Sequence, residues 1–421
     1  MRLHARDLLC ASLCLRVSVV MKTPCSPQRH GDTEMHREDP LLEIAALGYC
    51  KFLLRKQEAS VLLRRVRRET QRVRGRSHMR RYLFILIFVL GIPFFSRAAP
   101  RTLDIYFIDV EGGAATLIVT PLGESMLIDS GFPEQRDAER ILHVAKDVAG
   151  LTQIDHYITT HWHRDHVGGI TLLAKLFPVK NFYDHGIPSV LSSDISQQLI
   201  DAYRSVTQGK TITLNAGDQI KFLGDRLSPR INFRIVAANA LVVGEEAGSP
   251  QIKPCGPDFK PIDEDKTDNA NSLGMLLTFG AFRFFDGGDL TWNVENKLVC
   301  PKDLIGSVDL FQVDHHGAAN SNNPALVRSL KPRVAIIDNG PRKGAEPKTY
   351  ATLKSVRDID AIYQLHRNVA TSGLENTPSV YIANDDEKCL GEFIKVAVNP
   401  NGRSYRVEIP SKKIATTYKV R

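Results

Sequence analysis

The chain has 421 residues, of which 43% are apolar, enough to build a large hydrophobic core. Its net charge of +8 is uneven, because residues 1–98 carry 19 Lys and Arg against 8 Asp and Glu, whereas the remainder carries 36 basic and 39 acidic residues. Whole-chain charge therefore gives no support for a nucleic-acid-binding protein. Beyond residue 98 lie only Cys255, Cys300 and Cys389, without CxxC spacing, which excludes a disulfide framework and leaves either one bridge with a free thiol or none.

The sequence of residues 1–98 predicts an N-terminal leader. Residues 1–78 are rich in arginine and are expected to be either a misassigned start or a disordered basic leader. Residues 79–98 follow the layout of a signal peptide: Met79-Arg80-Arg81, an apolar run at 82–95, and small residues around Arg97. A membrane-spanning helix needs roughly 20 apolar residues, more than this run offers. We expect a periplasmic or secreted protein that starts at Met79; the alternative keeps 82–95 as a membrane anchor.

From residue 101 onwards, short β-rich segments alternate with amphipathic helical ones. Strands are predicted at 103–110, 114–120, 125–129, 157–160, 211–214, 219–223 and 231–237, and helices at 133–148, 169–177 and 194–206. The polar stretch at 240–268 contains four prolines, and so long a loop predicts a flap near a functional site.

The second half repeats this rhythm. Strands are predicted at 273–279, 282–285, 308–313, 334–337 and 362–365, helices at 324–330 and 349–356, and a terminal hairpin at 393–398 and 405–409. Two β-rich halves with helices between the strands predict an α/β protein, a four-layer αββα sandwich. We expect this domain to span 99–390, with residues 391–421 forming a β-hairpin and tail packed on it.

The most informative segment is His161-Trp162-His163-Arg164-Asp165-His166. It follows a β-branched run at 157–160 and precedes a helix start. Side chains alternate in an extended segment, so His161 and His163 are expected to point the same way and to grip one ion. If the chain turns after His163, Asp165 and His166 face a second ion. Imidazole and carboxylate without thiolate suit zinc, manganese or iron.

Further polar residues follow other predicted strands, where functional groups usually gather. Asp129 ends the run Leu127-Ile128-Asp129-Ser130-Gly131, Asp289 follows Gly287-Gly288, and the pair His315-His316 precedes Gly317.

Together with Phe107-Ile108-Asp109-Val110, these motifs resemble, in order and spacing, the metallo-β-lactamase superfamily over residues 103–385. The greatest similarity is to the hydrolase domain of the DNA-uptake protein ComEC and its free-standing relatives. The resemblance implies that His161 and His163 hold one metal, that Asp165 and His166 hold the other, and that Asp289 bridges them. One of His315 and His316 would complete a shell, and Asp129 would orient a ligand histidine or act as a turn cap.

Many members of the superfamily have a third histidine on the first metal. His185, which follows Tyr183-Asp184, is either this ligand or an ordinary loop histidine. His366, which ends the strand predicted at 362–365, is either a ligand, a substrate contact or neither.

The resemblance implies a hydrolase that binds two divalent ions, expected to be zinc, with manganese or iron as the alternatives. In it, Asp165 orients the attacking hydroxide or accepts its proton. The expected substrate is a phosphodiester in a nucleotide or DNA, and the basic loop 339–344 either reaches a phosphate or is a solvated turn. The alternatives are the same fold acting on a lactone, amide or other ester, a non-catalytic exported metal-binding protein, and an accessory of DNA uptake. The mildly acidic mature domain argues against DNA.

Overall fold

The computed structural model describes residues 101–223, 229–246 and 259–421, all within the compact unit Arg97–Arg421. The expected leader 1–78, the expected signal peptide or anchor 79–98, Cys255 and the centre of the expected flap lie outside these residues. Within the described part of the chain, no helix is long and apolar enough to cross a membrane.

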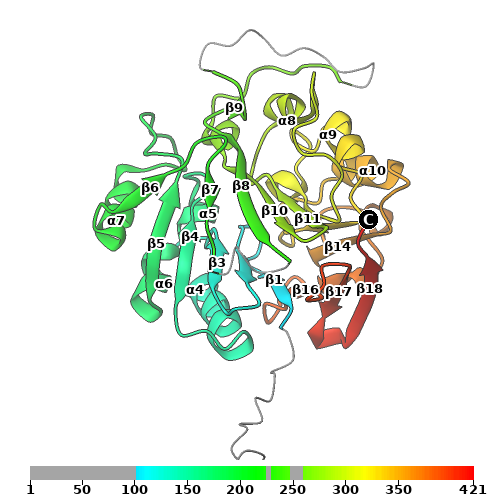
Figure 1. Cartoon of the computed structure of the whole chain (residues 1–421), viewed down its shortest axis with the longest axis horizontal. Coiled ribbons are helices and arrows are strands. Elements are labelled where there is room, and N and C mark those ends of the chain that lie inside the picture. Colours follow the sequence, from blue (N-terminus) through cyan, green and yellow to red (C-terminus); the bar gives the residue numbers. More distant parts are fainter. Residues whose placement is uncertain (1–100, 224–228, 247–258) are drawn as a thin grey trace, which may run out of the picture. The chain divides into compact units, whose positions relative to one another are not determined.

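Two large mixed sheets form the centre of the unit (Figure 1). Among the described residues, the first sheet has nine strands in the order β18 (Ile414–Lys419), β17 (Ser404–Ile409), β16 (Ile394–Val398), β1 (Leu103–Phe107), β2 (Thr116–Val119), β3 (Ser125–Ile128), β4 (Ile154–Ile158), β5 (Val179–Asp184) and β6 (Thr211–Thr213). The second has the order β15 (Ile382–Asn384), β14 (Ala361–His366), β13 (Val334–Ile337), β12 (Leu310–Gln312), β11 (Phe282–Asp286), β10 (Gly274–Phe279), β8 (Ile231–Ala238) and β7 (Gln219–Ile220), with β9 (Leu241–Val242) paired to β8.

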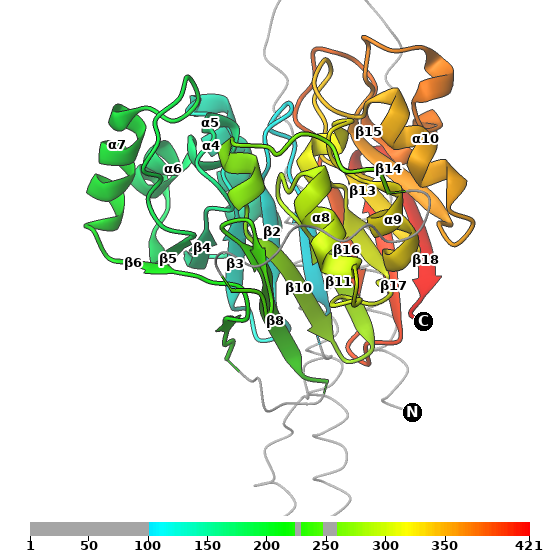
Figure 2. The ribbon, with the colours of Figure 1, turned by 90° about the horizontal axis from the view of Figure 1, so that it is seen from above.

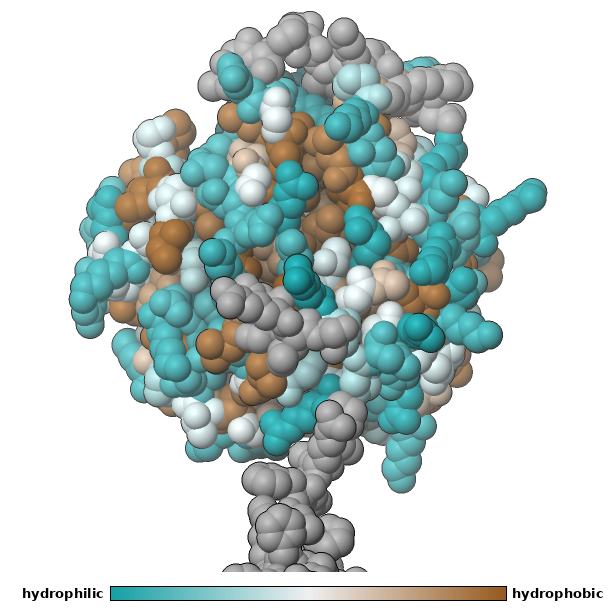
Figure 3. Space-filling view, in the orientation of Figure 1, coloured by the Kyte–Doolittle hydropathy of each residue, from teal (hydrophilic) through white to brown (hydrophobic). Residues whose placement is uncertain are grey.

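The helices cover the outer faces of the sheets (Figure 2). The first sheet is covered by α4 (Gln135–Leu142), α5 (Arg164–Val167), α6 (Ile170–Leu176) and α7 (Gln197–Thr207), and the second by α8 (Trp292–Val299), α9 (Pro324–Leu330) and α10 (Pro347–Ser355). On the face drawn in Figure 3, polar and apolar side chains are interspersed.

Strand alternation explains the layers. Ile105 and Phe107 of β1 enter the core between the sheets with Leu277 and Phe284, whereas Tyr106 of the same strand faces the core under the first helical layer. A third core joins the second sheet to α8, α9 and α10. Three cores separate four layers, so the predicted αββα sandwich is confirmed.

Parallel pairing places the functional loops. Strands β3 to β6 of the first sheet run parallel, as do β11 to β15 of the second. The carboxyl ends of parallel strands meet at one edge of a sheet, which is where ligands bind in α/β proteins. The loops after β3, β4, β11 and β12 contain the predicted metal-binding residues.

Several elements differ from those predicted by sequence, among them strands β5, β9 and β15, which were not predicted. The C-terminal hairpin gains a third strand, β18, and all three strands extend the first sheet. Helix α8 was not predicted, because half of its residues are polar. The helix predicted at 133–148 is α4 followed by a π-helical segment, His143–Val148.

Candidate metal centre

The loop between β4 and α5, residues 159–163, is fixed against the end of β3. The Ser130 N–H donates to the His166 carbonyl over 2.7 Å, and the Gly169 N–H donates to the Gly131 carbonyl over 3.0 Å. A Cβ atom on Gly169 would lie 1.9 Å from the Ser130 carbonyl oxygen, so this approach requires glycine. The loop therefore has little freedom to move away from the sheet.

His161, His166 and Asp289 form one group of converging donor atoms, all fully or almost fully buried. Asp289 Oδ1 lies 3.3 Å from Nε2 of His166, and its Oδ2 lies 3.8 Å from Nε2 of His161. Asp289 follows β11 after Gly288, which adopts a φ of +57°, and its N–H donates to Ser272 Oγ over 3.2 Å. Residues more than 120 positions apart are thus brought together.

Asp165, His166 and His316 form a second group that shares His166. Nε2 of His316 lies 3.1 Å from Nε2 of His166, 3.3 Å from Asp165 Oδ2 and 3.6 Å from Asp289 Oδ1. Asp289 therefore touches both groups. We call the five residues of these groups, His161, Asp165, His166, Asp289 and His316, the candidate metal centre.

The two adjacent histidines after β12 have different surroundings. Both have positive φ values, 54° for His315 and 53° for His316, a conformation that is rare outside glycine and clusters at functional sites. His316 points into the centre. His315 Nε2 lies 3.5 Å from Asp289 Oδ2, but it also contacts Asn269 Nδ2 at 3.3 Å, and its Nδ1 lies 3.2 Å from Ser321 Oγ. The geometry favours His316 as the ligand of the pair.

Carboxylates hold the outer nitrogens of the imidazoles. Asp129 Oδ2 lies 2.8 Å from Nδ1 of His166, and Asp129 also accepts hydrogen bonds from the N–H and hydroxyl of Thr160. On the other side, Asp338 Oδ1 lies 3.4 Å from Nδ1 of His316, but the two atoms make no hydrogen bond. A hydrogen-bonded outer partner such as Asp129 fixes the tautomer of a metal-binding histidine and leaves its Nε2 free for an ion.

The remaining predicted residues lie at the rim or elsewhere. The ring of His163 is 4.6 Å from that of His161 and borders a cavity. His185 has both nitrogens engaged, Nε2 with Asp268 at 3.1 Å and Nδ1 with Asn239 at 2.9 Å. His366 does not join the candidate metal centre, because its Nε2 lies 3.0 Å from Asp109 Oδ1 in a separate cluster.

The charges in the centre are strongly coupled. Burial alone would lower the pKa of His166, but Asp289, Asp165 and Asp129 raise it well above the ordinary value. Burial and the charge of His166 lower the pKa of His161 well below its ordinary value. Burial would raise the pKa of Asp289, yet His166 and His315 lower it far below the usual range. His161 is thus a neutral imidazole beside ionised carboxylates.

These residues fit divalent ions. Nε2 of His161 is buried and makes no hydrogen bond, although it points toward Asp289. Nε2 of His166 and Nε2 of His316 face each other, so at most one of them donates a proton to the other. Buried imidazole nitrogens beside carboxylates, without a thiolate, are the donor set of zinc, manganese and iron sites, and an ion that binds His166 takes the place of its proton.

Two residues around the centre, Asp268 and Asp338, were not predicted from the sequence. Asp268, at the end of the expected flap, accepts the Trp162 N–H over 2.7 Å and binds His185. Asp338 follows β13, and its place after a strand was the available signal. Lys343 belongs to the basic loop noted in the sequence, and its Nζ contacts Asp165 Oδ2.

A polar cavity of about 450 Å³ adjoins the centre. His163 and Asp268 line its inner side, and Lys266 and Thr267, from the described end of the expected flap, line another side. This volume lies in the usual range for small-molecule sites, roughly 300–1,000 Å³.

One part of the chain matches a known protein family. Residues 108–231 match the model of the metallo-beta-lactamase superfamily. Recombination protein 2 of Haemophilus influenzae is 23% identical over 260 residues, which are 61% of this chain and 26% of that protein. ComE operon protein 3 of Bacillus subtilis is 26% identical over 203 residues, 48% of this chain and 22% of that protein. This chain thus spans about a quarter of the length of either relative.

Among solved structures, MEM-A1, a subclass B3 metallo-beta-lactamase isolated from a soil metagenome library, aligns with 14% identity and a TM-score of 0.28. The alignment covers 63% of this chain and 77% of that protein.

Proposed function

On the premise that residues 108–231 carry a metallo-β-lactamase superfamily domain, we propose that this protein is an exported hydrolase that cleaves phosphodiesters with two divalent metal ions. Members of this superfamily usually are metal-dependent hydrolases. The observation that carries the proposal is Asp289, whose two carboxylate oxygens face His166 on one side and His161 on the other.

The chain's own residues have distinct tasks in this proposal. When bound, two divalent ions lower the pKa of a water molecule and neutralise charge that develops on the scissile group. His161, His166 and His316 would hold the ions, with Asp289 between them. Asp165, whose Oδ2 lies 3.3 Å from Nε2 of His316, would orient the water or accept its proton. Asp129 keeps the ring of His166 in position.

A phosphodiester is favoured by the charge beside the centre. Lys343 Nζ contacts Asp165 Oδ2, and the Lys343 side chain is 44% exposed, so a ligand from solvent can reach its ammonium group. A lysine offers a point charge suited to a phosphate. Lys266 brings a second cation to the cavity wall. A neutral lactone or amide would gain no charge–charge attraction from either ammonium group.

The name of one relative, a recombination protein, also favours a nucleic acid or nucleotide. Export is supported by the sequence layout of residues 79–98. It is further supported by Cys300, which takes part in a disulfide, since disulfides persist mainly in oxidising compartments.

The substrate test uses the purified full chain loaded with zinc or manganese. We expect turnover of bis-p-nitrophenyl phosphate and little turnover of nitrocefin or a lactone. The reverse preference would indicate that the substrate is a carboxylic ester or amide rather than a phosphodiester. If no ester is turned over and the protein binds fewer than two ions, the proposal that it is an enzyme is wrong.

Export is tested by amino-terminal sequencing of the protein from its producing cells. A mature chain beginning near Ala99 supports cleavage of the signal peptide. A chain that retains residues before Met79 contradicts it.

A further inference from the structure

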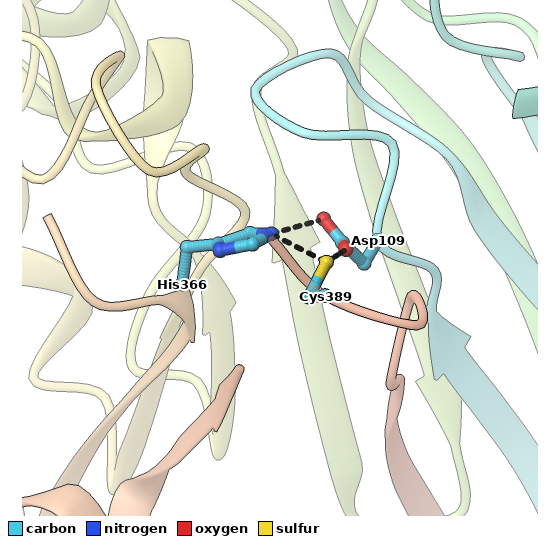
Figure 4. A group of neighbouring side chains, drawn as sticks. All are labelled: Asp109, His366 and Cys389. Atoms are coloured by element: carbon cyan, nitrogen blue, oxygen red, sulfur yellow. Dashed lines mark hydrogen bonds and ion pairs between the residues drawn. The ribbon is translucent and has the colours of Figure 1, made fainter. Parts of the chain in front are cut away.

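Three side chains from distant segments meet outside the candidate metal centre (Figure 4). Asp109 follows β1, His366 ends β14, and Cys389 follows β15. His366 Nε2 lies 3.0 Å from Asp109 Oδ1 and 3.5 Å from Cys389 Sγ, while Sγ lies 3.2 Å from Asp109 Oδ2. Asp109 and His366 are fully buried, and Cys389 is half-buried. We call these three residues the thiol cluster.

The thiol cluster is not arranged as a catalytic triad. In a triad, one nitrogen of the histidine faces the nucleophile and the other faces the carboxylate. Here Nε2 of His366 faces both Cys389 and Asp109, and Nδ1 is buried without a hydrogen-bond partner. Burial and Asp109 also raise the pKa of the Cys389 thiol to about 12, which keeps it protonated and unreactive.

We propose that Asp109, His366 and Cys389 bind a third metal ion, of the zinc type, at a site separate from the candidate metal centre. One sulfur, one nitrogen and one oxygen donor lie within 4.8 Å of one another, as three ligands of a single ion require. The thiolate selects a soft or borderline cation such as zinc over magnesium, calcium or manganese. Glu111, whose Oε1 lies 3.9 Å from Sγ, offers an oxygen for the fourth position.

The charges of the site balance with a dication. Binding breaks the S–H bond of Cys389 and forms a metal–sulfur bond, and the proton leaves to solvent. The thiolate and the Asp109 carboxylate then neutralise the two positive charges, with His366 as a neutral ligand. Since a proton is released, affinity rises with pH.

Arg140 is compatible with this site. Its Nη1 lies 3.0 Å from Asp109 Oδ2, and its Nη2 lies 3.5 Å from Cys389 Sγ. It also donates to Glu111 Oε1 at 3.0 Å and to the carbonyl oxygens of Asp109 and Cys389, both at 3.3 Å. When an ion takes the Asp109 carboxylate, the sulfur and Glu111 Oε1, Arg140 keeps the two carbonyl acceptors, and its positive charge offsets the negative charge of Glu111.

The site would connect the two sheets. Asp109 extends from β1 of the first sheet, whereas His366 and Cys389 extend from β14 and β15 of the second. An ion held by all three would add a bond between sheets that already share an apolar core and a few buried hydrogen bonds, such as that from Thr116 to Gln312. Its role is therefore structural.

Cobalt spectroscopy tests the proposal, because a thiolate-to-cobalt charge-transfer band reports only an ion bound to sulfur. The candidate metal centre contains no cysteine, so its occupancy does not contribute to the band. We expect the metal-free full-length protein to develop the band on cobalt addition, and zinc to abolish it. We expect Cys389→Ser to lose the band and His366→Ala to lose or weaken it.

Two controls separate this site from the proposed function. Asp289→Ala removes a residue of the candidate metal centre and keeps the band. His143→Ala, an exposed histidine paired with Asp147, leaves both metal content and band unchanged. If the band appears but the protein hydrolyses no ester, the third metal site is supported and the proposed function is wrong. No band in the wild type, or a band that survives in Cys389→Ser, overturns the third site.

A second measurement needs no variant. Wild-type protein with and without zinc is treated with iodoacetamide at high pH, and Cys389 is quantified by mass spectrometry. Protection of Cys389 by zinc supports the site, and equal alkylation in both samples overturns it.

Discussion

Oδ2 of Asp129 lies 2.8 Å from Nδ1 of His166, which leaves Nε2 of that imidazole facing Asp289 and His316. The substitution Asp129→Asn keeps the shape of the side chain, and asparagine tolerates the φ of 59° found at this position. It places an amide where a carboxylate orients the ring. We expect metal affinity to fall about 10–100-fold, measured by competition with a chromogenic chelator. An unchanged affinity would show that Asp129 serves only as a turn cap for Thr160.

Asp289 is the group on which both halves of the candidate metal centre depend. Removing its carboxylate in Asp289→Ala takes away a group whose oxygens lie within 4 Å of Nε2 of His161, His166 and His316. We expect phosphodiesterase activity to fall at least about 100-fold, as when a group that stabilises charge at an active site is lost. Elemental analysis should show fewer than two ions outside the thiol cluster. Full activity in this variant would contradict the proposed centre.

The ammonium group of Lys343 should bind the negative charge of the substrate. In Lys343→Met the stem of the side chain is largely kept while the ammonium group is lost. We expect KM for bis-p-nitrophenyl phosphate to rise about tenfold, equivalent to about 1.4 kcal/mol of binding, with a smaller change in kcat.

The matched control for Lys343 is Arg342→Gln. Arg342 is 66% exposed and pairs with Glu387 rather than with the centre, so its loss should leave both constants unchanged. If Lys343→Met loses the same fraction of its activity on a neutral ester as on the phosphodiester, Lys343 has no role in phosphate binding.

The close approach of Gly169 to Ser130 predicts a steric effect on stability. An added methyl group would meet the Ser130 carbonyl oxygen, so the metal loop or the end of β3 must shift. We expect Gly169→Ala to lower the free energy of unfolding by about 1–3 kcal/mol in urea titrations. Gly373→Ala is the control, because a methyl group there meets nothing within 4 Å. Equal stability of the two variants would contradict the predicted clash.

The thiol of Cys389 should be slow to alkylate in metal-free protein. Its pKa is raised from 9.0 to about 12, so near pH 8 the thiolate fraction is about 1,000-fold lower than for an ordinary thiol. The rate with iodoacetamide should rise tenfold per pH unit up to the pKa. Asp109→Asn removes the neighbouring negative charge, which lowers the pKa and speeds alkylation. A rate that levels off near pH 9 would contradict the shift.

The sequence predicted the residues of the candidate metal centre better than it predicted the residues that contact the other histidines. The HxHxDH segment, Asp289 and the histidine pair each follow a strand whose apolar run is visible locally. Parallel pairing aligns the strand ends within each sheet, and the packing of the two sheets brings the two sets of loops together. The roles of His185 and His366 were open because they depend on tertiary neighbours. Asp268 and Asp109, which hold these two histidines, lie 83 and 257 residues away from them.

The same reasoning explains the errors in the elements. Strand β18 alternates partly covered and exposed residues, with only Tyr418 buried, and it is paired with β17, which itself was predicted. Helix α8 buries Glu295 and Asn296 beside apolar residues, so its sequence shows little amphipathic pattern. Tertiary context overrides local preference in both cases.

The pairing of β1 with β16 sets a condition on biosynthesis. Leu103 lies opposite Val398, so the first strand of the domain acquires one of its two neighbours only after nearly the whole chain has left the ribosome. Until then, β1 presents an open edge that can recruit strands from other chains. A nonsense mutation or proteolytic cut before Ile394 should therefore yield aggregates rather than a smaller working enzyme.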